Sequence, residues 1–120
     1  MDFDLDAAGL RADSADLKTY IEVLARKFES ALPTHTVVER RSKRMLSREK
    51  VVESISVTLG DFLYELRSNG QASRAKAVRG VTIKTEPLAL DDWVQALADD
   101  LSARADESAE ARAALERLVN

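Results

Sequence analysis

The sequence contains no cysteine, which excludes disulfides, thiolate metal ligands and a cysteine nucleophile together. It has a single histidine, His35, so the common zinc sites built from several histidines are excluded as well. No stretch approaches the roughly 18 apolar residues of a membrane-spanning helix. The N-terminal MDFDLDAAGL is acidic and lacks the basic region of a secretory signal. We therefore expect a cytoplasmic protein, with peripheral attachment to a membrane surface as the alternative.

Glycine and proline are also scarce, at four and two in 120 residues, and they mark where elements should break. The remaining composition, 45% hydrophobic and 32% charged, is typical of a globular protein of one domain. We assign residues 13–120 to a single α+β domain and residues 1–12 to an acidic N-terminal arm. In this arm Phe3 and Leu5 alternate with aspartates, which is the period of a strand, but a mobile terminal segment is equally typical of such a stretch.

An amphipathic helix is predicted over residues 14–32. Asp13 or Ser14 can cap its first turn, and Pro33 should end it. Its apolar residues recur at spacings of three and four, which places them on one face: Leu17, Tyr20, Ile21, Leu24, Phe28 and Leu32.

Between residues 35 and 86 the apolar period changes from helical to two, which predicts strands at 35–41, 51–59, 62–67 and 74–85. Gly60-Asp61 and Asn69-Gly70 are typical of tight hairpin turns, so these strands should form an antiparallel meander. Within the fourth strand Val78 is out of phase with Val81, and we interpret Gly80 as a bulge that restores the register.

The apolar positions after Pro87 keep one helical phase to the end of the chain, and Asp91 can cap the first turn. This pattern favours one long helix over 92–119. The alternative is a break near 106–108, where Ser108 would cap a separate helix. Trp93 borders the apolar stripe and is expected in the core.

The predicted fold class is therefore α+β: an N-terminal helix, a four-stranded antiparallel meander and a long C-terminal helix, with the helices on one face of the sheet. The open edges of such a sheet favour a homo-oligomer. This order of elements resembles that of the small nucleoid-associated YbaB proteins, which are DNA-binding dimers. The resemblance covers most of the chain, but it is one of architecture only, and no motif matches residue by residue. In size, acidity and mixed content the chain is similar to small secretion chaperones.

The net charge of −3 conceals a strong segregation of charge along the chain. Residues 39–84 hold eleven basic and five acidic residues, whereas residues 85–120 hold three basic and nine acidic residues. The predicted sheet is therefore cationic and the predicted C-terminal helix anionic, a pattern that bears on partners more than on fold.

The densest basic stretch joins the first two predicted strands and should form a hairpin loop at residues 40–50. Its candidate partner-binding residues are Arg40, Arg41, Lys43, Arg44, Met45, Leu46, Arg48 and Lys50. Such a loop suits an acidic protein surface, the headgroups of an anionic membrane or the phosphates of nucleic acid. In the simplest interpretation the cations are only solvated, and Met45 and Leu46 fold back onto the body. A second basic patch is predicted at Arg74, Lys76 and Arg79.

The sequence shows no catalytic constellation, no phosphate-binding glycine loop and no metal signature. We interpret His35 as a structural or surface residue, and the pairs Asp91-Asp92 and Asp99-Asp100 as a solvated helix face. We therefore expect no enzyme activity and no cofactor. The predicted function is that of an adaptor or chaperone-like protein that binds a protein partner, with a YbaB-like nucleic-acid protein or a peripheral membrane module as the alternatives.

Overall fold

The computed structural model describes residues 14–43, 48–105 and 108–119. These described residues form a helix, five strands and two further helices. In order these are α2 (Ser14–Ala31), β1 (Thr36–Ser42), β2 (Lys50–Leu59), β3 (Phe62–Arg67), β4 (Ala72–Val78), β5 (Val81–Leu88), α3 (Leu90–Ala105) and α4 (Ala109–Val119). The predicted α+β class with one antiparallel sheet is confirmed. The predicted N-terminal arm at residues 1–12 lies outside the described residues.

Helix α2 ends at Ala31, two residues before Pro33 and one residue earlier than predicted. Its predicted stripe is the face that packs into the core, and Ile21, Leu24 and Phe28 are each almost fully buried. Because these residues recur every three or four positions, they line the side of the helix that faces the sheet.

The five strands form one sheet in the order β1-β2-β3-β4-β5, and every neighbouring pair is antiparallel. The predicted turns at Gly60-Asp61 and Asn69-Gly70 join β2 to β3 and β3 to β4. Gly60 and Gly70 have φ angles of 59° and 90°, which residues other than glycine rarely adopt. The glycines thus allow the chain to reverse direction at the turns between the alternating hydrophobic segments.

The prediction of four strands is wrong, because the segment 74–85 is a hairpin rather than one strand. Arg79 and Gly80 both have positive φ angles, 53° and 81°, which is the geometry of a two-residue hairpin turn. Val78 and Val81 lie opposite each other across this turn, which explains why they are out of phase along the chain. A bulge does occur, but it lies on β5 at Ile83, opposite the step from Lys76 to Ala77.

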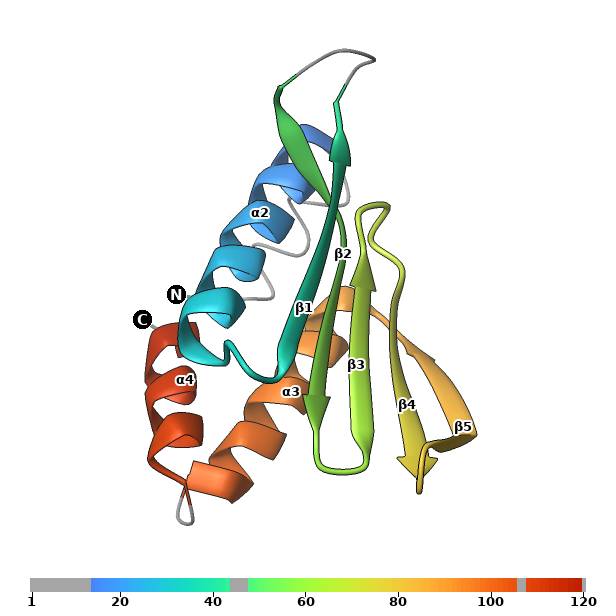
Figure 1. The fold of residues 1–120 in the computed structure, drawn as a ribbon, viewed down its shortest axis with the longest axis vertical. Coiled ribbons are helices and arrows are strands. Elements are labelled where there is room, and N and C mark those ends of the chain that lie inside the picture. The colour runs from blue at the N-terminus through green and yellow to red at the C-terminus, as the bar shows by residue number, and fades with distance from the viewer. Residues whose placement is uncertain (1–13, 44–47, 106–107, 120) are drawn as a thin grey trace.

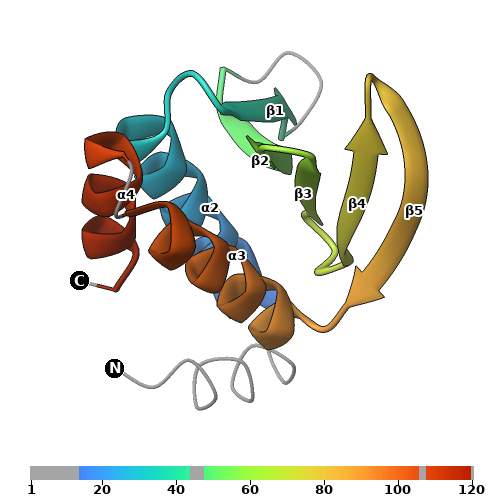
Figure 2. The ribbon, with the colours of Figure 1, turned by 90° about the horizontal axis from the view of Figure 1, so that it is seen from below.

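The prediction of one continuous C-terminal helix is also wrong, and the alternative of a break near 106–108 is confirmed. Ser108 is the N-cap of α4, since its Oγ accepts a hydrogen bond from the Ala111 amide at 3.2 Å. The break lets α4 fold back, so that Ala111 and Ala114 are buried. Figures 1 and 2 show α4 lying beside α2 instead of extending beyond the sheet.

The helices α2, α3 and α4 lie on the same side of the curved sheet, and the core fills the space between them and the sheet (Figure 2). Trp93 on α3 is fully buried at the centre of this core, as predicted. Its ring makes edge contacts with Phe28 and Tyr64 at centroid distances of 6.2 and 6.4 Å, and its Nε1 donates a hydrogen bond to the Ser73 carbonyl at 3.1 Å. Trp93 therefore joins α2, β3, β4 and α3.

Candidate functional site

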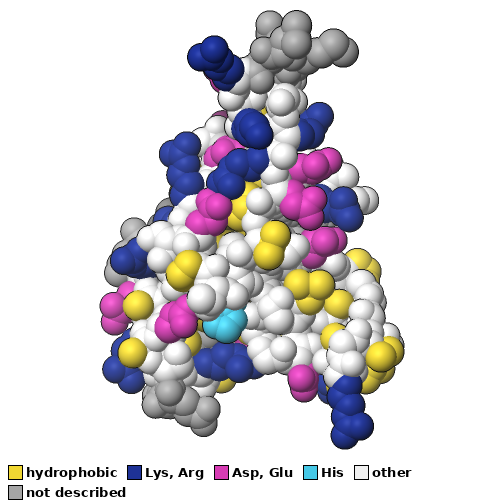
Figure 3. Space-filling model, viewed as in Figure 1, with side chains coloured by type: hydrophobic (Ala, Val, Ile, Leu, Met, Phe, Trp, Pro, Cys, Tyr) yellow, Lys and Arg dark blue, Asp and Glu magenta, His cyan; other side chains and the backbone are white. Residues whose placement is uncertain are grey.

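Strands β1 and β2 are paired up to Ser42 and Lys50, where the predicted basic loop of residues 40–50 begins and ends (Figure 1). We call the described part of this loop, residues 40–43 and 48–50, the basic arm. Of the loop's eight candidate residues, Arg44, Met45 and Leu46 lie outside the described residues. Five described cations of the arm are exposed: Arg40, Arg41, Lys43, Arg48 and Lys50. Figure 3 shows basic side chains gathered over this end of the molecule.

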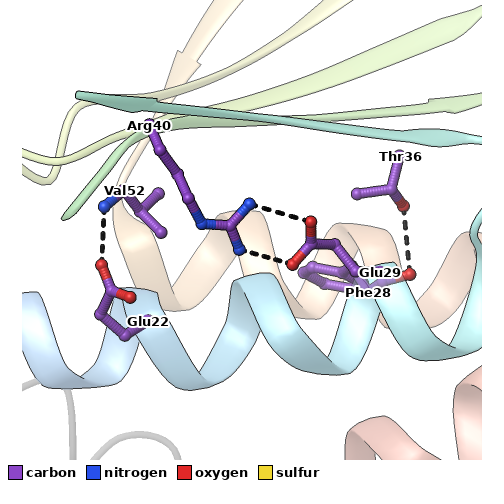
Figure 4. Close-up of polar contacts among 6 residues, drawn as sticks. All are labelled: Glu22, Phe28, Glu29, Thr36, Arg40 and Val52. Atoms are coloured by element: carbon purple, nitrogen blue, oxygen red, sulfur yellow. Dashed lines mark hydrogen bonds and ion pairs between the residues drawn. The ribbon is translucent and has the colours of Figure 1, made fainter. Parts of the chain in front are cut away.

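Arg40 differs from the other cations of the arm because it points toward α2 (Figure 4). Its guanidinium donates two hydrogen bonds to the Glu29 carboxylate, Nη2 to Oε1 at 2.6 Å and Nη1 to Oε2 at 3.0 Å. This bidentate contact lowers the pKa of Glu29 and raises that of Arg40. Arg40 therefore attaches the arm to α2, and its charge is already neutralised by Glu29.

A bulge in β2 explains why Arg40 turns inward. Glu39 pairs with Ser54 and Arg40 pairs with Val52, so Glu53 has no partner on β1. On the same side Glu22 of α2 accepts a hydrogen bond from the Val52 amide at 2.7 Å (Figure 4). Two carboxylates of α2, seven residues apart and hence on one face of the helix, thus hold the base of the arm.

The second predicted patch is at the opposite end of the sheet, on the β4–β5 hairpin (Figure 1). Arg74 is engaged within the body: its Nη2 is 3.6 Å from Glu86 Oε2, and its guanidinium carbon is 5.0 Å from the centre of the Phe62 ring. Lys76 and Arg79 are exposed, as is Lys84, which lies directly opposite Lys76. The fold therefore keeps the two basic regions apart.

A set of hydrogen-bonded polar side chains that the sequence pattern does not reveal links α3 to the sheet. Asp100 is half-buried and accepts hydrogen bonds from the Tyr64 hydroxyl at 2.8 Å and from Arg104 Nε at 2.7 Å. Burial, assisted by the hydrogen bond to Asp100, raises the pKa of Tyr64 to about 12. The interpretation of Asp99-Asp100 as a solvated pair is correct for Asp99 only, which is exposed.

His35 lines an open hollow of about 260 Å³ between the start of β1 and the α3–α4 junction. Its Nε2 lies 4.0 Å from Glu110 Oε2, and both side chains are more than two-fifths exposed. Arg104 and Ser108 also line this hollow, but Arg104 is paired with Asp100 and the Ser108 hydroxyl caps α4. The arrangement joins the first strand to the last helix, and its polar groups are occupied by structural contacts.

Within the described ranges, no group of three or more histidine, cysteine, aspartate or glutamate side chains is placed to hold a metal ion. None of the described helices is both long and apolar enough to cross a bilayer. Comparison with known proteins finds no matching family model, curated protein or solved structure.

Proposed function

We propose that this protein is a non-catalytic binding protein, an adaptor or chaperone-like module, whose basic arm receives an acidic and extended segment of a protein partner. The observation that carries the proposal is the position of the arm's exposed cations on a hairpin whose outer strand, β1, is an edge of the sheet. An edge strand offers backbone hydrogen bonds, and the cations offer charge selectivity.

The two edges of the sheet differ in how well they are protected. β5 contains Pro87 and the bulge at Ile83, which are features that discourage the addition of a further strand. β1 contains no proline, and Val37 on it is 61% exposed. The edge formed by β1 is therefore the better acceptor for an extended peptide.

The charges along the arm favour a peptide with alternating carboxylates. Arg41 is on β1 and Lys43 directly follows its last residue, Ser42, so the two cations lie near each other where the strand ends. Lys43 has one acidic neighbour, Glu49, at 3.6 Å, but both side chains are more than half exposed and such a pair is weak. Both cations thus remain accessible to carboxylates of an added strand.

The same surface suits nucleic acid less well. Glu49 lies within the arm, Glu39 and Glu53 flank it, and residues 85–120 carry nine acidic against three basic residues. A polyanion along the arm would be repelled by these groups, whereas a short acidic peptide needs only the local contacts.

The test measures binding of a fluorescent peptide that alternates glutamate with valine, against the same peptide with lysine in place of glutamate. We expect the acidic peptide alone to bind and the Arg41→Gln/Lys43→Gln variant to lose about tenfold in affinity, since each exposed ion pair contributes up to about 1 kcal/mol. The matched control is Arg26→Gln/Lys27→Gln on α2, which removes the same charge and should bind normally. Hydrogen exchange should slow in β1 amides when the peptide binds.

Equal loss of affinity in both double variants would contradict the proposal, as would unchanged exchange in β1. A DNA duplex is tested in parallel. If it binds more tightly than the peptide, with affinity falling roughly 10³-fold between 50 and 200 mM salt, the nucleic-acid function replaces the one proposed here.

A further inference from the structure

The end of the β4–β5 hairpin exposes apolar side chains to an unusual extent, and we call residues 76–84 the apolar tip. Val81 and Ile83 are 65% and 63% exposed, and Val78, opposite Val81, is 38% exposed. These are three of the six large exposed hydrophobic residues in the described part of the chain. Single exposed apolar residues need no explanation, but a cluster at the end of a projecting hairpin does.

Three cations surround these apolar side chains. Arg79 lies in the turn itself, and Lys76 and Lys84 face each other across the two strands. Like charges in directly opposed positions destabilise a strand pair, so this arrangement costs free energy in the isolated protein. An anionic surface against the tip would remove that cost. The neighbouring Glu86 does not neutralise the lysines, because its carboxylate is paired with Arg74.

We propose that the apolar tip docks this protein on an anionic lipid surface. Val81 and Ile83 would enter the boundary between headgroups and acyl chains, while Lys76, Arg79 and Lys84 would contact the headgroup phosphates. A convex tip suits a fluid interface because lipids adapt to its shape, whereas a folded protein partner would need a matching groove. The surface of a nucleic-acid duplex is polar, so Val81 and Ile83 could be buried there only at the cost of unstacking bases.

This docking is compatible with the function proposed for the basic arm and does not depend on it. The arm and the apolar tip lie at opposite ends of the sheet, in a molecule 43 Å along its longest axis (Figure 1). A tip-down orientation therefore leaves the arm directed away from the lipid. The same chain would hold a soluble partner at the membrane surface.

The test is flotation of the full chain with vesicles of phosphatidylcholine alone or mixed with phosphatidylserine. We expect binding to the mixed vesicles only. The Val81→Ser/Ile83→Ser variant should bind at least tenfold more weakly. The Lys76→Gln/Arg79→Gln/Lys84→Gln variant should bind about 100-fold more weakly, from roughly fivefold for each cation near the surface. All the replaced side chains are exposed, and circular dichroism verifies that the variants fold.

Two controls match these variants. Val37→Ser removes an equally exposed valine from β1, and Arg41→Gln/Lys43→Gln/Lys50→Gln removes the same charge from the basic arm. Both should bind mixed vesicles normally. The proposal is overturned if the wild-type chain does not bind mixed vesicles, or if the arm variant loses as much binding as the tip variant. It is also overturned if the Val81→Ser/Ile83→Ser variant binds vesicles as tightly as the wild-type chain, or if the effect of this variant is only to dissociate an oligomer that forms without lipid.

Discussion

Replacement of Asp100 should destabilise the protein far more than replacement of its neighbour Asp99. The half-buried Asp100 carboxylate accepts hydrogen bonds from Tyr64 and Arg104, and the Tyr64 side chain is almost fully buried. The Asp100→Ala variant leaves the Tyr64 hydroxyl proton without its acceptor, at a cost of about 1–3 kcal/mol. The Arg104 contact adds less, since that side chain is 40% exposed and screened by water.

We therefore expect Asp100→Ala to lower the free energy of unfolding by about 2–3 kcal/mol. In a chain of this length that corresponds to a decrease of roughly 10 °C in Tm. The assay is urea unfolding followed by circular dichroism. An unchanged slope of the free energy of unfolding against urea concentration would show that the folded and unfolded states keep their compactness. Asp99→Ala is the control, because Asp99 is exposed and accepts a hydrogen bond from the side chain of Gln95 at 2.9 Å. This replacement should change the free energy of unfolding by less than about 0.5 kcal/mol.

A double-mutant cycle with Tyr64→Phe isolates the contact between β3 and α3. If the hydroxyl and the carboxylate interact as described, the two replacements should be coupled by about 1 kcal/mol or more. Additive effects, or a cost for Asp99→Ala equal to that for Asp100→Ala, would refute the reasoning.

Two further predictions follow from the same part of the fold. In a Tyr20→Phe variant, the absorbance of ionised tyrosine should rise near pH 12 rather than pH 10, because burial raises the pKa of Tyr64. Since the folded state holds the Tyr64 proton more tightly than the unfolded state, the stability that this proton contributes is full below pH 10 and is lost between about pH 10 and 12. A rise in absorbance near pH 10 in the folded protein would contradict this prediction. Replacement of Ser108 by alanine should cost about 1 kcal/mol in thermal or urea unfolding, because the amide of Ala111 loses its cap. Ser102→Ala, at an exposed position inside α3, should leave stability unchanged or slightly raised, and equal losses at both serines would argue against the cap.

The periodic parts of the fold were predictable because they depend on local spacing. The stripe from Leu17 to Phe28 and the alternation in β2 and β3 specify their elements before any tertiary contact is considered. The two errors have a common cause, which is that an unbroken apolar phase does not exclude a reversal of the chain. Arg79-Gly80 carries a turn that the alternating pattern does not reveal, and Ser108 caps a helix although the apolar phase continues through it.

The candidate site was predictable in its charge but not in its contacts. The density of cations at residues 40–50 is visible in the sequence, whereas the neutralisation of Arg40 depends on a bulge that brings it against Glu29. The two carboxylates at positions 22 and 29 share one helix face, but nothing local indicates which strand they meet. The apolar tip was hidden for a similar reason, since its hydrophobic residues resemble those of a buried strand.

The return of α4 onto α2 has a consequence for the order of events during synthesis. Arg117 of α4 hydrogen-bonds Ser30 of α2, a contact that joins residues 87 positions apart. The surface of α2 that α4 covers must therefore remain exposed to water, or bound by a chaperone, until α4 has left the ribosome. A truncation after α3 would leave that surface uncovered permanently, and such a fragment should be a substrate for proteolytic quality control.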